Sequence, residues 1–290
     1  MHFNHLPLLR AGAFFGLLAA FSACTLPASA NPPAGYRLGW SEEFKGPVGM
    51  PPDPARWGYD TGDNGWGNNE LENYVRDTEH AQVVADPAAS GGKALQILVT
   101  SNGQGIARGN FQSARLLTRG KFAFQYGYIE ARIRMPYGQG LWPAFWLLGA
   151  NLGDPGVGWP SCGEIDIMES KGSKPGWNAS SLHGPGYSGG GCVTSAYTLP
   201  AGQQFKDKYH TFGLLWKRDF VQFFVDGIPF ETRTPADIPG KTWVYNHPFF
   251  VLLNVAVGGN FTGSPDATTV FPQKMMVDYI RVYQPKTGKS

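Results

Sequence analysis

Three acidic residues lie close together in the segment Gly163-Glu164-Ile165-Asp166-Ile167-Met168-Glu169-Ser170. Glu164 and Asp166 are two positions apart, so on a β-strand both carboxylates share one face while the isoleucines between them enter the core. Glu169 breaks this period and would face the core, where an unpaired carboxylate is costly. A β-bulge near Met168 would absorb one residue and return Glu169 to the same face. We therefore expect three carboxylates in a row on one strand.

The spacing of Glu164 and Glu169 favours cleavage of a glycosidic bond. With the bulge, their Cβ atoms lie about 13 Å apart at about 3.3 Å per residue, and an inward lean of about 3–4 Å by each side chain leaves the carboxyl groups about 5–7 Å apart. Retaining glycosidases hold this pair about 5–5.5 Å apart and inverting ones about 6.5–9.5 Å. The estimate favours retention without excluding inversion. Asp166 would tune the pKa values of both glutamates. A solvated acidic strand or a cation site is the alternative interpretation.

Tryptophans near these acids predict a sugar-binding cleft. Trp142 and Trp146 are four positions apart in Leu141-Trp142-Pro143-Ala144-Phe145-Trp146 and would share one face of an extended segment. A tryptophan offers a flat apolar body that can stack on a pyranose and an N–H that can donate to a hydroxyl. Two core tryptophans are the alternative. Further cleft-lining candidates are Trp66, Asn68 and Asn69 in a glycine-rich loop and Trp159 shortly before the acids.

Strand patterns dominate the rest of the chain. In Gly127–Met135 apolar and charged residues alternate, as in a half-buried antiparallel strand, and Asp226-Gly227 splits Phe220–Phe230 as in a two-residue hairpin turn. The content of Gly 39 and Pro 23 among 290 residues fits many short strands joined by turns. We expect an all-β fold of two packed antiparallel sheets in one domain over residues 31–290. Further strands are expected at Ala94–Thr100, Leu141–Leu148, Glu164–Glu169, Phe249–Val257 and Met275–Tyr283.

The first thirty residues predict a signal peptide. Arg10 precedes an apolar run from Ala11 to Ala23, and Ala28-Ser29-Ala30 matches the small-x-small cleavage pattern. The run is shorter than the roughly 20 residues that span a bilayer, so no transmembrane segment is expected. The mature chain would start at Asn31 and be secreted to an extracellular or periplasmic space. A buried core helix and lipoprotein anchoring through Cys24 are the alternatives.

Charge and composition restrict the partners. Lys+Arg 24 against Asp+Glu 22 gives a net charge of +2, with no basic run, so a nucleic-acid partner has no electrostatic support. A neutral polysaccharide is expected as the partner, because a sulfated polymer would need several arginine or lysine contacts. The protein is also expected to be a monomer. The histidines after the signal peptide show no metal-ligand spacing, so no cofactor is expected for catalysis. They are His80, His183, His210 and His247.

Two cysteines remain after the signal peptide. Cys162 directly precedes the acidic segment, and Cys192 lies thirty positions after Cys162. An even pair in a chain bound for an oxidising compartment predicts one disulfide. Two buried free thiols are the alternative.

Taken together, these segments resemble glycoside hydrolase family sixteen, in its laminarinase-like group of bacterial endo-1,3-β-glucanases. The resemblance covers Gly35 to Gln284. It rests on Gly67-Asn68-Asn69-Glu70-Leu71, Ser113-Ala114-Arg115-Leu116, Trp142-Pro143-Ala144-Phe145-Trp146, Gly163 to Glu169, Leu182-His183-Gly184 and Val277-Asp278-Tyr279-Ile280-Arg281-Val282-Tyr283. The family implies a concanavalin-like β-jelly roll with a concave substrate cleft.

The resemblance also implies residue roles in a retaining double displacement. Glu164 is similar to the nucleophile, Asp166 to the supporting acid and Glu169 to the acid/base. A structural calcium on the convex sheet face, held by Asp278 and backbone oxygens near the N-terminal strand, is a further implication. Asn68, Arg115, Trp142, Trp146 and His183 correspond to subsite residues, and Trp159 joins them only through its nearness in sequence.

Other functions on the same scaffold stay open at this point. The linkage could be mixed 1,3-1,4 or that of a β-1,3-galactan, and a sugar instead of water could capture the intermediate, as in a transglycosylase. A non-catalytic glucan-recognition module is a third class. It would have no need to keep both Glu164 and Glu169, so hydrolysis of internal β-1,3-glucosidic bonds in laminarin-type glucans is the favoured prediction.

Overall fold

The computed structural model describes residues 1–2 and 32–286. The predicted signal peptide and Cys24 fall outside the described residues, apart from positions 1 and 2. Among the residues described, no helix has the length and apolar character needed to cross a membrane.

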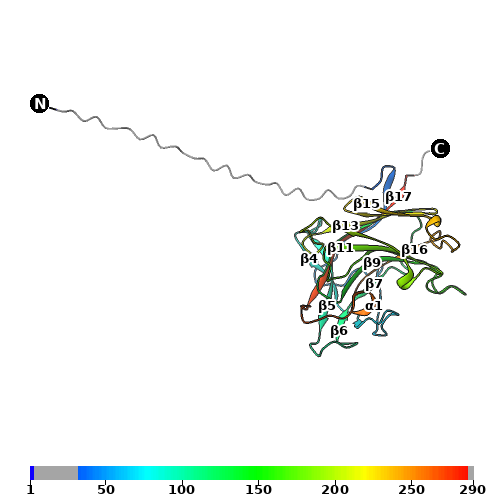
Figure 1. The fold of residues 1–290 in the computed structure, drawn as a ribbon, viewed down its shortest axis with the longest axis horizontal. Coiled ribbons are helices and arrows are strands. Elements are labelled where there is room, and N and C mark those ends of the chain that lie inside the picture. Colours follow the sequence, from blue (N-terminus) through cyan, green and yellow to red (C-terminus); the bar gives the residue numbers. More distant parts are fainter. Residues whose placement is uncertain (3–31, 287–290) are drawn as a thin grey trace.

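The chain folds into two β-sheets, which confirms the predicted all-β class (Figure 1). The larger sheet has the order β15-β14-β13-β8-β17-β5-β6-β3, with β1 beside β17 and β4 beside β5. Its strands are β1 Tyr36–Glu42, β3 Glu72–Tyr74, β4 Ala81–Ala85, β5 Lys93–Ser101, β6 Phe111–Ser113, β8 Gly127–Arg134, β13 His210–Lys217, β14 Phe220–Val225, β15 Ile228–Arg233 and β17 Gln273–Pro285. Its pairings are antiparallel except for β3 with β6.

The smaller sheet has the order β12-β11-β10-β9-β16-β7-β2. Its strands are β2 Gly58–Asp60, β7 Arg115–Leu117, β9 Leu141–Gly149, β10 Glu164–Glu169, β11 Trp177–His183, β12 Val193–Thr198 and β16 Phe249–Val257. The remaining elements are the short helix α1 Gly259–Thr262 and two 3₁₀ turns, η1 Gly189–Gly191 and η2 Pro235–Asp237. All eight strands predicted from the sequence, including the two of the hairpin, are present.

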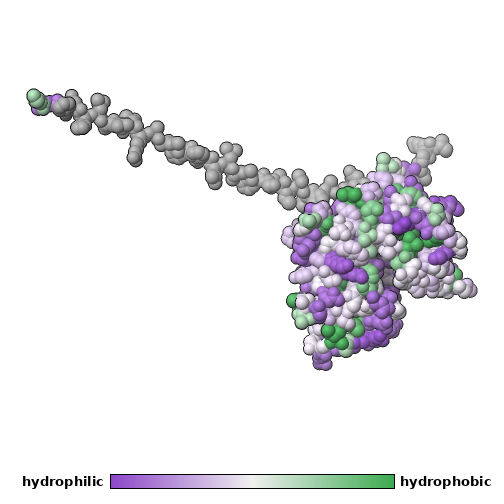
Figure 2. All heavy atoms as spheres, in the orientation of Figure 1, coloured by the Kyte–Doolittle hydropathy of each residue, from purple (hydrophilic) through white to green (hydrophobic). Residues whose placement is uncertain are grey.

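The main core lies between the two sheets. Ile129, Ala131 and Ile133 from β8 pack in the same buried cluster as Phe145 and Leu147 from β9. The polar residues that alternate with them point outward, as the period-two pattern predicts. On the face shown in Figure 2, hydrophilic and hydrophobic residues are interspersed.

The predicted hairpin joins β14 and β15. Its turn residues Asp226 and Gly227 have φ values of 50° and 75°, which suits the turn types that match the twist of two antiparallel strands. The Asp226 carboxylate accepts a hydrogen bond from the backbone of Thr211 at 2.9 Å and faces His210 Nδ1 at 2.6 Å. The turn is therefore anchored to the neighbouring strand β13.

Candidate active site

Strand β10 carries the three acids on the outer face of the smaller sheet. Glu164 and Glu169 are half-buried and Asp166 is buried, whereas Ile167 and Met168 both belong to the core between the sheets. The pairing register shifts after Asp166 on both neighbouring strands. The predicted β-bulge is therefore confirmed, and it returns Glu169 to the face of the other two acids.

The register also fixes the separation of the two glutamates along the sheet. Glu164 pairs with Leu148 and Glu169 with Ala144 on strand β9, so they are four strand positions apart. This is the spacing from which a carboxyl separation of about 5–7 Å was estimated above.

Each glutamate accepts a hydrogen bond from one indole. Trp142 Nε1 donates to Glu169 Oε1 at 2.9 Å, and Trp159 Nε1 donates to Glu164 Oε2 at 2.9 Å. Trp159 is 49% exposed, so its ring borders the acids and remains open to a ligand. The structure thus brings Trp159 to the acids, although the sequence placed it there only by nearness.

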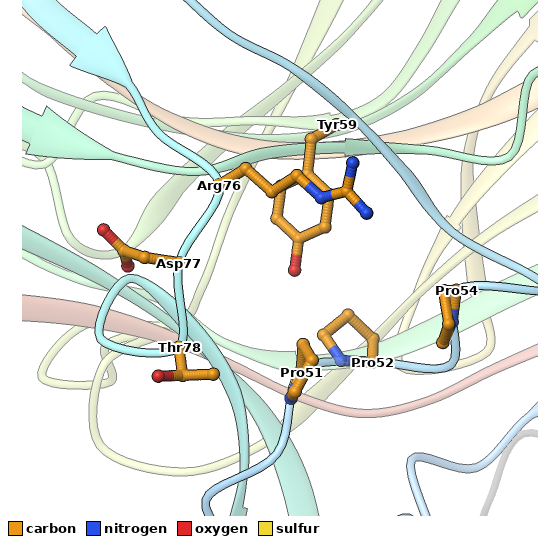
Figure 3. Close-up of a pocket in the computed structure, with 7 residues that line it drawn as sticks. All are labelled: Pro51, Pro52, Pro54, Tyr59, Arg76, Asp77 and Thr78. Atoms are coloured by element: carbon orange, nitrogen blue, oxygen red, sulfur yellow. The ribbon is translucent and has the colours of Figure 1, made fainter.

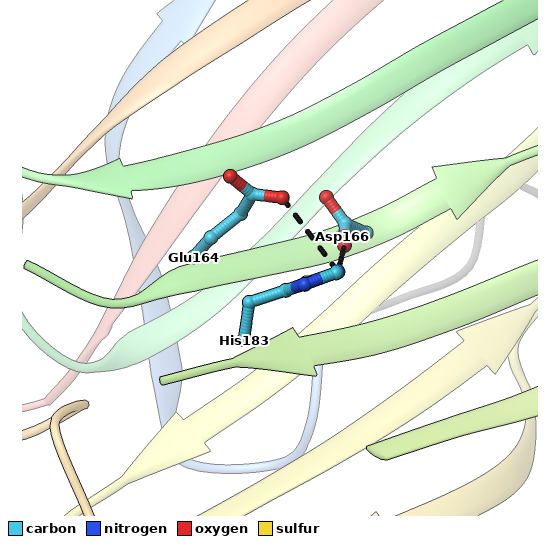
Figure 4. A group of neighbouring side chains, drawn as sticks. All are labelled: Glu164, Asp166 and His183. Carbon is cyan, nitrogen blue, oxygen red and sulfur yellow. Dashed lines mark ion pairs between the residues drawn. The ribbon is translucent and has the colours of Figure 1, made fainter. Parts of the chain in front are cut away.

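His183 on β11 faces Glu164 and Asp166 (Figure 4). Its Nε2 lies 3.0 Å from Asp166 Oδ2 and 3.7 Å from Glu164 Oε1. The backbone N–H of Gly189 donates to its Nδ1 at 3.1 Å, so Nδ1 carries a lone pair and Nε2 carries the proton. Hydrogen bonding to Asp166 and the charges of both carboxylates raise the pKa of His183, while the Gly189 amide opposes a second ring proton. The proton-bearing Nε2 therefore faces the Asp166 carboxylate.

Burial and crowding raise the pKa values of both glutamates, to different extents. Burial, reinforced by the negative charge of Asp166, raises the pKa of Glu164 to about 7. The same two causes raise the pKa of Glu169 well above its usual range. His183 and an indole N–H favour ionisation of both groups, and the nearer contact of His183 with Glu164 makes that effect larger there. Glu164 is therefore the first of the two to ionise as the pH rises.

The predicted subsite residues Arg115 and Trp146 lie on neighbouring strands of the same face. The Arg115 guanidinium stacks 4.7 Å from the Trp66 ring and 4.9 Å from the Trp146 ring. Its Nε also donates to Asp60 at 3.1 Å, a residue that the sequence did not single out. Asn68 is held beside this group by a hydrogen bond of 3.0 Å to Glu70.

Two further aromatic residues continue the site beyond Glu169. Phe261 of α1 lies 4.9 Å from Trp142 and 6.1 Å from Trp177 between ring centroids, and Lys171 Nζ lies 4.3 Å from the Phe261 ring. Sequence reasoning missed both Phe261 and Trp177. An aromatic residue two positions after the Gly258-Gly259 pair was the available signal for Phe261.

The other end of this face is closed by the segment 150–163. Leu152 and Val157 pack against an apolar cluster on the outer side of the sheet, which comprises Leu117, Ala144, Trp146, Leu148, Cys162, Phe250 and Leu252.

In this structure Cys162 and Cys192 are both free thiols, unlike the predicted disulfide. Cys162 precedes β10 and Cys192 precedes β12, with β11 between those strands. Two strand spacings amount to about 9–10 Å, and a disulfide needs Cα atoms about 4.4–6.8 Å apart. Burial raises the pKa of Cys162 to about 11, so this thiol stays protonated.

The predicted calcium at Asp278 is also not supported by the structure. The backbone and side chain of Ser90 donate to the Asp278 carboxylate at 3.0 Å, and Arg132 donates to it at 2.5 Å. Arg132 also donates to the carbonyl oxygen of Ala88 at 3.2 Å. The Asp278 carboxylate thus already has Arg132 and Ser90 as partners. These residues do not fit calcium, and Asp278 is an ion-pair partner in this structure.

One group of potential metal ligands lies in the site itself. Glu164, Asp166 and His183 each offer one ligand atom, and these atoms lie within 4.8 Å of one another. The sequence spacing did not reveal this cluster, because His183 joins it from a neighbouring strand. In this structure His183 Nε2 already faces both carboxylates, as described above.

A separate pocket lies on the opposite side of β2 from Arg115. It is formed by three prolines around the phenol of Tyr59, with Arg76 over the ring (Figure 3). Tyr59 and Asp60 are adjacent on the strand and point to opposite faces, and Asp60 faces Arg115. This pocket is therefore not part of the acidic face.

Comparisons with known proteins agree with this geometry. The profile of glycosyl hydrolases family 16 matches residues 73–281. The laminarinase catalytic domain of Thermotoga maritima MSB8 is 43% identical, with a TM-score of 0.76 over 86% of this chain and 98% of that one. The endo-β-1,3-glucanase of Pyrococcus furiosus is 42% identical, with a TM-score of 0.77 over 87% of this chain and 96% of that one. A β-glucanase of Rhodothermus marinus is 33% identical over 96% of this chain and 95% of its own length.

The fold and the paired carboxylates define a glycoside hydrolase. The profile match and the similarity to these relatives over nearly their whole lengths show that the chain belongs to glycosyl hydrolases family 16. The family predicted from the sequence motifs is thereby confirmed.

Proposed function

We propose that this enzyme hydrolyses internal β-1,3-glucosidic bonds of neutral laminarin-type glucans with retention of configuration. The observation that carries the proposal is the placement of Glu164 and Glu169 four strand positions apart on one face, each with an indole donor and with Asp166 between them. The names of the relatives from Thermotoga maritima and Pyrococcus furiosus support the β-1,3 linkage.

In this mechanism the two glutamates divide the work through their protonation states. Glu169, which keeps its proton, donates it to the leaving glycosidic oxygen while the ionised Glu164 attacks the anomeric carbon. Glu164 forms a glycosyl-enzyme as the old bond breaks. Glu169 then takes a proton from water, and the water oxygen displaces Glu164. Two inversions at the anomeric carbon leave a β-configured product.

Asp166 and His183 support both steps without changing bonds to the sugar. The Asp166 charge keeps the proton on Glu169, because two adjacent carboxylates resist ionising together. The Nε2–H of His183 lies 3.0 Å from Asp166 and 3.7 Å from Glu164. It therefore holds Asp166 in place and offsets part of the negative charge beside the nucleophile.

Asn68, Arg115, Trp142, Trp146 and Trp159 are proposed to bind the glucan on either side of the scissile bond. Their indoles suit the C–H faces of pyranoses, and Arg115 keeps its guanidinium between the rings of Trp146 and Trp66. The near-balance of charges in the chain favours a neutral polymer. We also propose that the enzyme is secreted after loss of residues 1–30 and acts as a monomer.

The test is a product profile on laminarin, curdlan, lichenan, agarose and galactan. Rapid release of laminari-oligosaccharides of intermediate length from laminarin and curdlan is expected, with little product from agarose or galactan. Comparable rates on lichenan would make the enzyme a mixed-linkage glucanase. Binding to laminarin without new reducing ends would contradict hydrolysis, and longer oligosaccharides from a laminari-oligosaccharide donor would indicate transglycosylation.

A further inference from the structure

A continuous chain of side-chain hydrogen bonds joins Asn68 to Trp146 behind the proposed glucan-binding surface. Asn68 Nδ2 donates to Glu70 Oε1 at 3.0 Å, and the Tyr74 hydroxyl donates to Glu70 Oε2 at 3.3 Å. Asn254 Nδ2 donates to the Tyr74 oxygen at 2.9 Å, and Trp146 Nε1 donates to Asn254 Oδ1 at 2.8 Å. Every donor in this chain points toward Glu70.

This direction makes both carboxyl oxygens of Glu70 acceptors. The Asn254 amide already donates to the Tyr74 oxygen, so the single hydroxyl proton of Tyr74 is directed to Glu70. The other carboxylate oxygen of Glu70 takes the Asn68 proton. Glu70 is only 4% exposed, so its charge depends on these donors and on any further proton beside it.

Glu72 is the neighbour that can supply that proton. It follows Glu70 by two positions, is 0% exposed, and its Oε2 accepts the Val257 N–H at 2.6 Å. Its Oε1 is buried and finds no donor among the described residues. Two buried carboxylates without a cation between them cannot both ionise at low cost. Burial, followed by the charge of Glu70 and a hydrogen bond between the two carboxyl groups, raises the pKa of Glu72 well above its usual range.

We propose that Glu72 is a positioning residue, held as a neutral carboxylic acid that donates its Oε1 proton to Glu70. Glu70 then remains the ionised acceptor that fixes Asn68 directly and Trp146 through Tyr74 and Asn254. This inference rests on the proposed function only in assigning Asn68 and Trp146 to glucan binding. The arrangement of the two carboxyl groups is independent of the substrate.

Three variants separate this role from simple packing. In Glu72→Gln, the new amide can donate to Glu70 and its oxygen can accept from Val257, so the network is retained. Glu72→Leu removes both contacts at similar volume. Glu79→Gln, an exposed site at which a carboxyl group is also replaced by an amide, is the matched control.

The first measurement is the infrared difference spectrum between wild type and Glu72→Gln at neutral pH, without substrate. The carbonyl-stretching band of a protonated carboxylic acid is expected in wild type and lost in the variant, whereas wild type minus Glu79→Gln shows no such band. Absence of the band from the first difference would mean that Glu72 is ionised and would overturn the proposal, whatever the enzyme hydrolyses.

The second measurement is steady-state kinetics on laminarin. Glu72→Gln should keep KM and kcat within about twofold of wild type, whereas Glu72→Leu should raise KM about tenfold with a smaller change in kcat, because substrate binding loses its fixed partners. A KM for Glu72→Gln raised roughly tenfold or more would contradict the donor role, and this variant keeps the test decisive if Glu72→Leu does not fold. A wild type that is inactive on laminarin would refute the proposed function and leave the infrared result standing.

Discussion

Buried carboxylates lie on the outer faces of both sheets, with different partners on each. On the larger sheet, Asp278 is paired with Arg132, and its second partner is Ser90. On the smaller sheet, Asp166 has two glutamates and one histidine as neighbours. A carboxylate beside a guanidinium has its charge compensated and serves the fold, whereas crowded carboxylates shift one another's pKa and become able to transfer protons. The difference lies in the neighbours, since the burial is similar.

Removing an acid from the crowded cluster should have the largest effect. Glu164→Ala loses the nucleophile and should lower kcat on laminarin more than about 10⁴-fold. Azide can enter the vacated space, and it should restore turnover and give an α-glycosyl azide.

Glu169→Ala should lower kcat on polysaccharide about 10²–10⁴-fold and affect the first step on aryl glycosides with activated leaving groups much less. Equal losses on both kinds of substrate would contradict the proton-donor role of Glu169.

Asp166→Asn keeps the shape of the cluster and removes the charge in its centre. Activity requires Glu164 ionised and Glu169 protonated, so it falls below the pKa of Glu164, about 7, and above the raised pKa of Glu169. Asp166 raises both values, so its loss should move both limbs of the kcat/KM profile to lower pH, with roughly tenfold lower activity at the optimum. Limbs that stay in place would show that the Asp166 charge does not tune the glutamates.

Breaking the ion pair on the larger sheet should affect stability and leave the chemistry intact. Arg132→Met leaves Asp278 buried and unpaired, which should lower the free energy of unfolding by about 3–5 kcal/mol. Adding Asp278→Asn should recover much of this loss, because it removes the uncompensated charge. Urea unfolding measures both variants, and kcat on folded protein is the control. A fall in kcat comparable with that of Asp166→Asn would remove the distinction between the two faces.

The smallest effects are expected from chelator and from reducing agent. Arg132 already compensates Asp278, so EDTA should leave the melting temperature unchanged. Both cysteines are free, so dithiothreitol should also leave it unchanged, and alkylation of unreduced, unfolded protein should label Cys162 and Cys192. A calcium-reversible fall in melting temperature would favour the predicted calcium, and a Cys162–Cys192 peptide in mass spectrometry would favour the predicted disulfide.

Local patterns were sufficient to predict most of the fold and the centre of the site. The break in period between Asp166 and Glu169 required the bulge, and the spacing of Trp142 and Trp146 placed both indoles on the outer face. These features depend only on neighbours in the chain.

Features that depend on long-range neighbours were missed, or differ in the structure from what the sequence predicted. The sequence could not show that Arg132 would lie beside Asp278, or that a whole strand would separate Cys162 from Cys192. The sequence also could not show that Glu70 belongs to a hydrogen-bond network with Tyr74 and Asn254, because these two residues lie 180 positions apart.

The anomeric configuration of the first product tests the central account most directly. Proton NMR in the first minutes of laminarin hydrolysis, before mutarotation, distinguishes the two stereochemical outcomes. A double displacement on Glu164 with Glu169 as acid/base predicts the β-anomer. Initial appearance of the α-anomer would contradict it and make Glu164 a general base that acts through water.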